Sequence, residues 1–265
     1  MIVVNFDLWR GYRFGNKLLG VNNLIQISNV FKQDYFFTKF DGLDIFDIIT
    51  QTKDYDSQSC EILDITKLIE NKESLTLDND KYYTFNPCLF EFFYDFSDLS
   101  TFDIFKVKKP YVSDKTKVAV HFRGTDFFEW DSNCILSHEY YINSIKYVLE
   151  ESNNTSIYLF TDDNNLQSLN LTKDWLTTQK INYNLGSISN YMDDFISISL
   201  SDYVISSPST FCITASFCGK KNKKIIHSKD FIEGYKLKSN YYRDVFWKKL
   251  YYNSDNTDYK IYKLI

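Results

Sequence analysis

The chain has 265 residues, of which 25% are charged and 18% are aromatic, and its formal net charge at pH 7 is -5. This negative balance argues against broad nucleic-acid binding, and no run of about 18 uncharged apolar residues is present to form a membrane-spanning helix. The length suffices for one large α/β domain or for two smaller α/β lobes.

The amino terminus is predicted to form a strand, a glycine-bearing turn and a helix. Residues 2–6 read as the strand, Gly15 lies in the turn, and the apolar spacing of residues 17–27 predicts an amphipathic helix. Such a unit suits an anion, because glycine lets a ligand approach the backbone and a helix start offers N–H groups. The sequence lacks the three-glycine dinucleotide fingerprint and the Gly-Lys-Ser/Thr phosphate loop, so neither a nicotinamide enzyme nor a P-loop NTPase is indicated.

A second strand, predicted over residues 118–122, ends in a cluster of polar side chains. It is followed by Arg123, Gly124, Thr125 and Asp126. A buried strand of this kind delivers polar groups to the carboxyl edge of an α/β sheet, where such folds bind ligands. The rigid fork of Arg123 suits a diphosphate, although an arginine here can equally be the partner in a structural ion pair.

The next predicted strand covers residues 156–161 and ends in Asp162 and Asp163. Paired carboxylates after a strand often form only the turn that precedes a helix. At the edge of an α/β sheet, a carboxylate can also accept hydrogen bonds from a ribose or a guanine base. The sequence leaves both interpretations open.

A hydroxyl-rich loop is predicted between a short strand over residues 203–205 and a helix that begins near Ser209 or Thr210. A preceding helix is predicted to end near Leu200. Hydroxyl residues before a helix are usually N-caps, but the same geometry can hold a phosphate. The side chains expected to face inward from the later helix are Ala215, Phe217 and Cys218.

The carboxyl-terminal part is basic and then aromatic. Residues 220–224 contain four lysines after a helix predicted to end at Gly219, which favours a solvated loop over a membrane-surface patch. Residues 236–265 are predicted to form a terminal helix and tail that pack back across the lobes, because aromatic residues recur there at helical spacing. The five cysteines have no Cys-x-x-Cys spacing, which indicates reduced, mostly buried thiols.

Four of these segments, taken in order, resemble the motifs of one enzyme superfamily. They are Arg-Phe-Gly-Asn at residues 13–16, His-x-Arg-x-x-Asp at 121–126, Phe-Thr-Asp-Asp at 160–163 and Ser-x-Ser-Thr-Phe at 207–211. This order resembles the GDP-fucose-dependent fucosyltransferases, which include the α1,2- and α1,6-fucosyltransferases and the protein O-fucosyltransferases. The resemblance covers residues 10–27 and 118–219. It implies an α/β fold of the GT-B type, with two Rossmann-like lobes and the donor site in the cleft between them.

The resemblance also implies which residues hold the diphosphate of the donor. Gly15 and Asn16 would contact it from the amino-terminal turn, while Arg123 would neutralise it and assist its departure. His121 would help to shape the donor pocket, and Asp126 would orient neighbouring groups.

The remaining motif residues would bind the nucleoside end of the donor. Asp162 or Asp163 would face the nucleoside, and Ser209, Thr210 and Phe211 would close over the phosphates and the base. The donor is then GDP-fucose as a substrate, with no further cofactor.

One position departs from the pattern of the superfamily. The α1,2 and α1,6 members usually carry a second arginine where this chain has Gly124. The Arg-Gly-Thr-Asp form is not diagnostic of one branch, so this motif leaves the linkage open. The resemblance implies fucosyl transfer to a glycan or oligosaccharide acceptor, with α1,2 or a related linkage as the expectation.

The chemistry of inverting fucosyl transfer agrees with the residues present. A departing diphosphate needs charge stabilisation, which Arg123, backbone N–H groups and a helix start supply without a metal. A general base for the acceptor hydroxyl is also expected, with Glu129 as the first candidate and Asp126 and Asp131 behind it. The competing interpretation of Glu129 is an exposed loop acid.

Two alternative functions remain open. Asp78-Asn79-Asp80 matches the Asp-x-Asp signature of metal-dependent glycosyltransferases, in which carboxylates hold Mn²⁺ or Mg²⁺ against a nucleotide sugar. The same segment is strongly turn-forming, which favours a plain turn. The other alternative is a nucleotide-sugar-binding protein that has the fold but no turnover.

The expected organisation has three parts. Residues 1–112 would form the acceptor-side lobe, 113–235 the lobe that holds GDP, and 236–265 the terminal helix and tail. The amino terminus lacks a basic region followed by an apolar one, so a secretory signal is not expected. We therefore expect a cytoplasmic enzyme of glycan biosynthesis acting at the inner membrane face, with peripheral membrane contact as an open alternative and no nucleic-acid partner.

Overall fold

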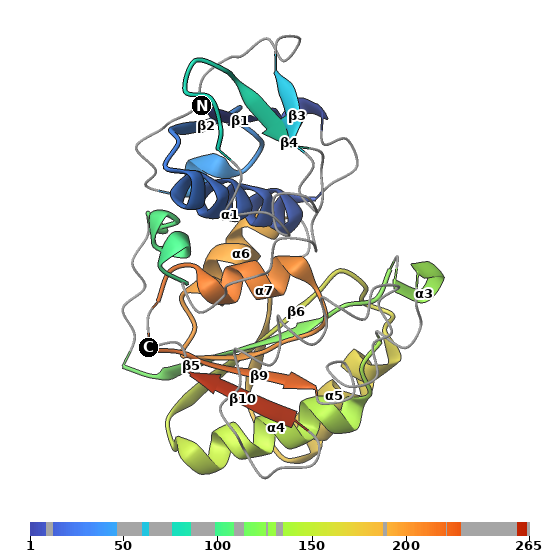
Figure 1. Ribbon diagram of the computed structural model, residues 1–265. Coiled ribbons are helices and arrows are strands. Elements are labelled where there is room, and N and C mark those ends of the chain that lie inside the picture. The colour runs from blue at the N-terminus through green and yellow to red at the C-terminus, as the bar shows by residue number, and fades with distance from the viewer. Residues whose placement is uncertain are drawn as a thin grey trace. The chain divides into compact units, whose positions relative to one another are not determined.

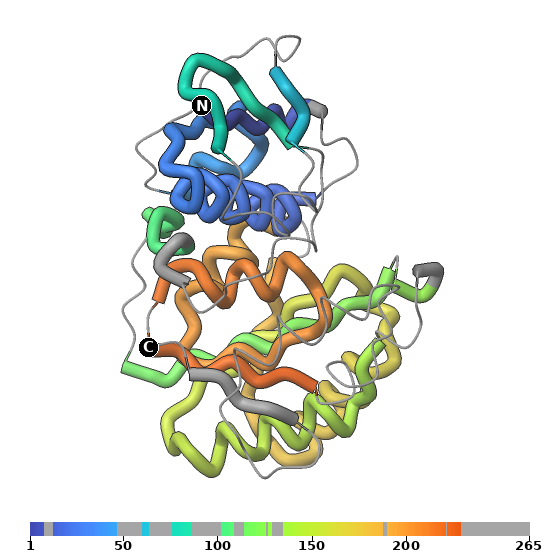
Figure 2. Tube along the Cα trace, viewed as in Figure 1, coloured from blue at the N-terminus to red at the C-terminus, as the bar shows by residue number. Residues whose placement is uncertain are grey.

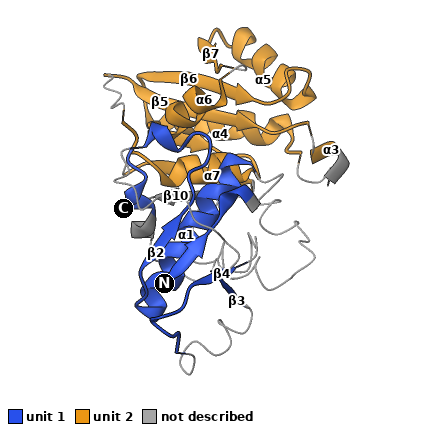
Figure 3. Cartoon of the chain, turned by 90° about the horizontal axis from the view of Figure 1, so that it is seen from above, with its two compact units in different colours: residues 1–106 blue, residues 107–265 orange. Residues whose placement is uncertain are grey.

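The computed structural model describes residues 1–8, 13–46, 60–63, 76–85, 99–108, 114–125, 127–130, 135–187, 190–220, 222–228 and 259–263. The chain divides into two compact units, Met1–Lys106 and Val107–Ile265 (Figure 3). The division lies slightly before the lobe boundary expected after residue 112.

Unit 1 is built on a parallel four-stranded sheet in the order β2-β1-β4-β3. Its strands are β1 (Ile2–Val4), β2 (Tyr35–Phe37), β3 (Glu61–Leu63) and β4 (Tyr83–Phe85). The helix α1 (Phe14–Phe31) packs against β1 and β2. Short 3-10 turns complete the described part at η1 (Phe6–Leu8), η2 (Leu43–Ile45) and η4 (Leu99–Ile104).

The core of unit 1 is rich in phenylalanine. Phe6 and Phe40 pack edge to face with ring centroids 4.8 Å apart, and Phe46 packs against Phe105 at 5.1 Å. Such aromatic pairs contribute about 0.5 to 1.5 kcal/mol each beyond the area that they bury. The high phenylalanine content is therefore used, at least here, to fill a small lobe that has short strands.

Unit 2 contains a six-stranded sheet in the order β10-β9-β8-β5-β6-β7. The parallel strands are β5 (Thr116–Phe122), β6 (Thr155–Thr161), β7 (Tyr183–Leu185), β8 (Tyr203–Ile205) and β9 (Lys224–Ser228). The edge strand β10 (Tyr259–Lys263) pairs antiparallel with β9. The central strand β5 is buried along nearly its whole length, as its β-branched run predicts.

Helices cover both faces of this sheet (Figures 1 and 2). The helices α4 (His138–Glu151) and α5 (Gln167–Thr178) lie on one face, and α6 (Tyr191–Ser199) and α7 (Thr210–Phe217) lie on the other. A short helix, α3 (Phe127–Trp130), follows β5. This doubly wound arrangement has a topological switch point between β5 and β8, because the chain leaves β5 in one direction across the sheet and returns to its other side at β8.

The predicted elements in unit 2 match the observed ones closely. The predicted strand over residues 203–205 is β8, and the helix predicted from Ser209 or Thr210 is α7. In unit 1, α1 begins at Phe14 and is longer than predicted at both ends. The aromatic stripe of residues 236–258 lies outside the described residues, and the described part of the tail is the strand β10.

The basic run at residues 220–224 differs from the prediction of a solvated loop. Lys223 is completely buried, and its Nζ donates to the carbonyl oxygens of Ser199 and Cys218 at 2.7 and 2.9 Å. Lys220 forms an ion pair with Asp202. Two carbonyls at the ends of α6 and α7 explain the buried charge, since helix termini leave acceptors that need partners.

The described thiols agree with the predicted reduced and mostly buried cysteines. Cys212 and Cys218 are buried and Cys60 is half-buried, all three as free thiols. Within the described ranges, no helix is both long enough and apolar enough to cross a membrane.

Candidate functional site

The candidate site lies at the switch point between β5 and β8. His121 at the end of β5 shares a hydrogen bond of 2.7 Å with Ser207, which follows β8, through Nδ1 and Oγ. Burial lowers the pKa of His121 well below its usual value, with the charge of Asp162 opposing this shift and that of Arg123 adding to it. The imidazole is therefore neutral at pH 7, and it connects the two strands on either side of the switch point.

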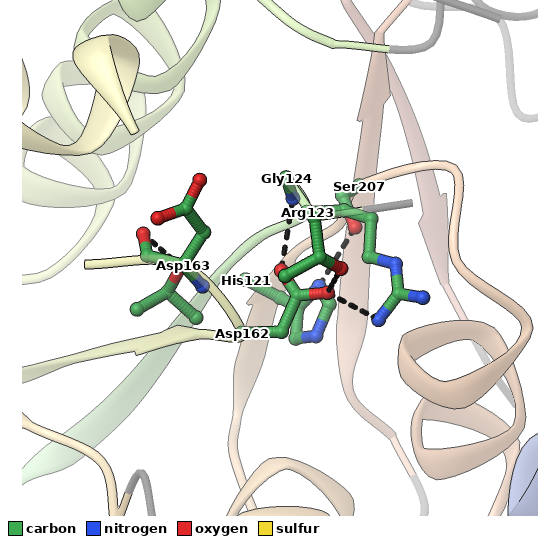
Figure 4. Close-up of polar contacts among 8 residues, drawn as sticks. His121, Arg123, Gly124, Asp162, Asp163 and Ser207 are labelled. Atoms are coloured by element: carbon green, nitrogen blue, oxygen red, sulfur yellow. Dashed lines mark hydrogen bonds and ion pairs between the residues drawn. The ribbon is translucent and has the colours of Figure 1, made fainter. Parts of the chain in front are cut away.

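Arg123, directly after β5, is held by an acid and an aromatic ring. Its Nη1 forms an ion pair with Oδ2 of Asp162 at 2.5 Å (Figure 4). Its Cζ lies 5.1 Å from the centroid of the Phe127 ring, which is a cation–π distance. The side chain is 11% exposed, so it lies mostly buried directly after β5, at the carboxyl edge of the sheet.

Asp162 binds the three residues that follow β5, Arg123, Gly124 and Thr125. Besides the ion pair with Arg123, its Oδ1 accepts a hydrogen bond of 2.8 Å from the backbone N–H of Gly124. Its Oδ2 accepts another of 2.6 Å from the hydroxyl of Thr125. The strand register explains this arrangement, because Phe122 on β5 pairs with Thr161 on β6, and the next residues are Arg123 and Asp162.

Asp163 has different contacts from its neighbour. Its Oδ1 accepts a hydrogen bond of 2.9 Å from the N–H of Asn165, and its backbone N–H bonds to the hydroxyl of Thr161. These bonds shape the turn before α5, as one of the two sequence interpretations held. Asp163 also explains Gly124, because a Cβ at residue 124 would lie 2.8 Å from the Cβ of Asp163.

The serine loop after β8 is buried and tightly bonded. Ser206, Ser207 and Ser209 are all buried, and the N–H of Ser209 donates to the carbonyl of Ser207 at 2.7 Å. The Tyr140 hydroxyl lies 2.8 Å from the carbonyl oxygen of Ser206. Ser209 is the N-cap residue of α7 but makes no side-chain cap bond, so the loop is held by backbone hydrogen bonds together with the side chains of Tyr140 and His121.

Phe211 connects the serine loop to the histidine. Its ring centroid lies 5.9 Å from that of His121 and 5.3 Å from that of Phe195 on α6. Thr210 and Phe211 occupy the first turn of α7 and are half-buried. The start of α7 therefore lies beside His121 at the same sheet edge as Arg123.

One acid at this edge was given no role by the sequence analysis. Asp194, in the first turn of α6, is buried, and its Oδ1 accepts a hydrogen bond of 2.6 Å from the N–H of Ser187. Burial raises the pKa of Asp194 to about 6. An available signal is its position in the apolar helical pattern, one residue before the buried Phe195.

The other predicted site residues are distributed as follows. Gly15 and Asn16 lie in the first turn of α1 and belong to unit 1, whereas Arg123 belongs to unit 2. Asp126 and Asp131 lie outside the described residues. Glu129 lies on α3, and its side chain also falls outside the description.

The Asp-x-Asp segment of unit 1 forms a turn. Oδ1 of Asp78 accepts a hydrogen bond of 2.9 Å from the N–H of Asp80, and Oδ1 of Asn79 accepts one of 2.6 Å from the side-chain amide of Gln33. All three residues of the segment are exposed. Across the described part of the chain, no group of three or more His, Cys, Asp or Glu side chains is placed to hold a metal ion.

Comparison with known proteins identifies structural neighbours. No protein-family model matches the sequence, and no curated protein matches it. The fold is similar to crystal structures of the protein O-fucosyltransferase POFUT1. The complex of POFUT1 with GDP-fucose has a TM-score of 0.56 and 11% identity, covering 82% of this chain and 92% of that one.

Two further POFUT1 structures give the same result. The apo form has a TM-score of 0.55 and 10% identity, covering 82% of this chain and 94% of the other. The complex with GDP has a TM-score of 0.54 and 11% identity, covering 82% and 93%. The chain therefore has an α/β fold of the GT-B type, with Rossmann-like parallel sheets, as in POFUT1.

Proposed function

We propose that this protein is an inverting glycosyltransferase that moves L-fucose from GDP-β-L-fucose to a hydroxyl of a glycan acceptor without a metal ion. The observation that carries the proposal is the guanidinium of Arg123, held by Asp162 at the carboxyl edge of β5, where the first turn of α7 packs against His121. It occurs in a fold similar to that of POFUT1, which has been crystallised with GDP-fucose and with GDP.

In the proposed reaction, the acceptor oxygen attacks the anomeric carbon of fucose while the bond from that carbon to the β-phosphate oxygen breaks. Negative charge then grows on the departing diphosphate. Arg123 neutralises this charge, and the N–H groups at the start of α7 add to its effect. The loss of a single electrostatic donor of this kind typically costs about 3 to 4 kcal/mol of transition-state stabilisation.

The donor pocket is proposed to extend from Arg123 along the serine loop to Phe211. His121 is neutral, so it shapes the pocket without adding a second positive charge. Ser209, Thr210 and Phe211 would close over the phosphates and the base, while Gly15 and Asn16 would contribute the diphosphate contacts of unit 1.

The guanine base offers two neighbouring N–H donors at its Watson–Crick edge, and a carboxylate is the natural acceptor for both. Asp162 or Asp163 was the candidate for the nucleoside from sequence. Asp194 now joins them, because its carboxylate lies on α6 next to Phe195, which packs against Phe211.

The acceptor side of the proposal retains Glu129 as the first candidate for the general base and Asp126 as the residue that orients its neighbours. A linkage of the α1,2 or a related type, a cytoplasmic location at the inner membrane face and a role in glycan biosynthesis belong to the same proposal. Binding of nucleic acid is not part of it.

Donor binding tests this proposal. GDP and GDP-fucose should raise the melting temperature, because a ligand that binds only the folded state stabilises it by mass action, by about 2.7 kcal/mol at 100 times Kd. UDP and ADP should have much smaller effects. Equal stabilisation by UDP and GDP in calorimetry would remove the guanine assignment.

A further inference from the structure

We infer that Asp162 is a positioning residue for Arg123: it aims the guanidinium at the departing diphosphate and holds the loop that carries it. This inference rests on the proposed function and deepens it. It assigns Asp162 a role at the phosphate end of the donor, whereas the sequence suggested a contact with the nucleoside.

The contacts of Asp162 support this role because they occupy both carboxylate oxygens. Oδ2 accepts from Nη1 of Arg123 at 2.5 Å and from the hydroxyl of Thr125 at 2.6 Å. Oδ1 accepts from the N–H of Gly124 at 2.8 Å. All three donors are consecutive residues of one loop, so the carboxylate binds that loop as a unit (Figure 4).

The backbone of the loop needs this anchor. Thr125 has a φ of 23°, which is uncommon for any residue other than glycine and costly for a β-branched one. Strained backbone persists only where surrounding contacts fix it, and the Asp162–Thr125 hydrogen bond is such a contact. Asp162 therefore fixes the turn that follows Arg123 as well as the guanidinium itself.

Asp163 shows that the two acids of the pair differ in role. Its Oδ1 accepts a hydrogen bond from the N–H of Asn165 in its own turn, and its Cβ lies where a side chain at residue 124 would have to go. Asp162 faces the Arg123 loop instead. The division of roles follows from the strand register, which places Asp162 beside Arg123.

A positioning role predicts an effect on turnover more than on binding. Removal of the Asp162 charge leaves the positive charge of Arg123 available to attract a diphosphate, so donor affinity should hold. The guanidinium would no longer be aimed, and a misplacement of about 1 Å at a reacting centre costs about 10²-fold in rate.

The test uses Asp162→Asn, alone and together with Arg123→Ala. The asparagine keeps an oxygen that accepts from the loop but removes the charge. We expect turnover of GDP-fucose to fall by about 10- to 100-fold while the Kd for GDP changes less than about threefold. In the Arg123→Ala background, the same substitution should change turnover by less than about twofold, because Asp162 acts through Arg123.

Asp202→Asn is the matched control. Asp202 also accepts a backbone N–H, from Lys117 at 2.9 Å, and forms an ion pair, with Lys220, but it lies at the opposite edge of the same sheet. Turnover of GDP-fucose by the Asp202→Asn variant should stay within about twofold of the wild type. An equal fall in turnover caused by Asp162→Asn with and without Arg123 would overturn the inference.

A second measurement separates this inference from the proposed function. NMR of the arginine Nε–Hε group reports the order of the Arg123 side chain in the protein without any donor. Asp162→Asn should make this group mobile, whereas Asp202→Asn should not. An equally ordered Arg123 in Asp162→Asn would contradict the inference even if the protein proved inactive on GDP-fucose, whereas wild-type inactivity alone would count against the proposed function.

Discussion

The two edges of the unit 2 sheet use similar residues for different purposes. The carboxyl edge holds Arg123, Asp162 and the serine loop, which meet at the switch point between β5 and β8. At the amino edge, Lys117 is the second residue of β5 and Asp202 precedes β8. The N–H of Lys117 donates to the Asp202 carboxylate, and the N–H of Asp202 donates to the carbonyl of Lys117. Cations, acids and hydroxyls are thus present at both ends of the same strands.

The difference lies in what the cations bind. At the amino edge, Lys223 is fully buried against carbonyls of α6 and α7, and the Nζ of Lys117 donates to the Ser197 hydroxyl at 2.8 Å. Arg123 instead pairs with a carboxylate and is partly exposed. The amino group of Lys223 supplies hydrogen bonds to helix carbonyls within the fold, whereas the guanidinium of Arg123 lies at the edge where we propose that the donor binds.

The largest effect on turnover is expected from substitution of Arg123, the cation of the carboxyl edge. Arg123→Ala should lower turnover of GDP-fucose by about 10² to 10³, or about 3 to 4 kcal/mol, because charge grows beside it in the transition state. Arg123→Lys should restore little, since a point charge does not reproduce a bidentate contact. Steady-state kinetics measures both, with circular dichroism and the melting temperature as checks of folding.

The next effect concerns Gly124. Gly124→Ala places a Cβ 2.8 Å from the Cβ of Asp163, so the loop or the α5 turn must shift. Because the N–H of Gly124 binds Asp162, we expect the shift to disturb Arg123 and to reduce turnover by about 10-fold or more. Wild-type kinetics in this variant would show that the loop tolerates the displacement and that its geometry is not critical.

The third prediction concerns Lys223, the buried lysine of the amino edge. Lys223→Met should lower the free energy of unfolding by about 1 to 3 kcal/mol, because it leaves helix carbonyls without a donor. Below the melting transition, turnover should stay within about twofold of the wild type. Thermal unfolding and the same kinetic assay give the two values. A large loss of turnover in a well-folded variant would contradict the assignment of this edge to stability alone.

The stability difference between the wild type and Lys223→Met should depend on pH. Its pH dependence follows from the pKa of Lys223, which burial lowers to about 7. Between pH 7 and the unfolded value of 10.5, the unfolded chain holds a proton that the folded one has lost. Stability due to this residue therefore rises with pH across that window. The melting temperature of the wild type relative to that of Lys223→Met should therefore rise from pH 6.5 to pH 9. A difference in melting temperature that stays constant over this range would contradict the lowered pKa of Lys223.

The smallest expected effect concerns metal. If Arg123 and backbone donors hold the phosphates, EDTA should leave the rate within about twofold, since no cation supplies Lewis-acid stabilisation. Loss of activity in EDTA, restored by Mn²⁺ and abolished by Asp80→Ala, would favour the Asp78-Asn79-Asp80 alternative instead.

Much of the unit 2 fold followed from local sequence patterns. The β-branched runs predicted β5, β6 and β8, and the residues after each run predicted which polar groups reach the carboxyl edge. These elements are short runs of β-branched and aromatic residues that end in polar ones, and this length and composition distinguish them from helices where periodicity alone does not.

The individual contacts did not follow, because they depend on register and on partners distant in sequence. The pairing of Asp162 with Arg123 requires the alignment of β5 with β6. The burial of Lys223, just before β9, requires the carbonyl of Ser199 at the end of α6, 24 residues earlier in the chain. The burial of Asp194 likewise depends on how α6 packs, and the local signal for it is its position one residue before the buried Phe195 rather than the acidic first turn itself.

The most direct test of the central claim is the release of GDP from GDP-fucose by the wild-type protein, compared with GDP-mannose and UDP-sugars. Slow donor hydrolysis reveals the donor even without an acceptor. The proposed function predicts GDP release from GDP-fucose that exceeds nucleotide release from the other donors and that depends on Arg123. Preferential cleavage of a UDP-sugar, or GDP release that Arg123→Ala leaves unchanged, would contradict it.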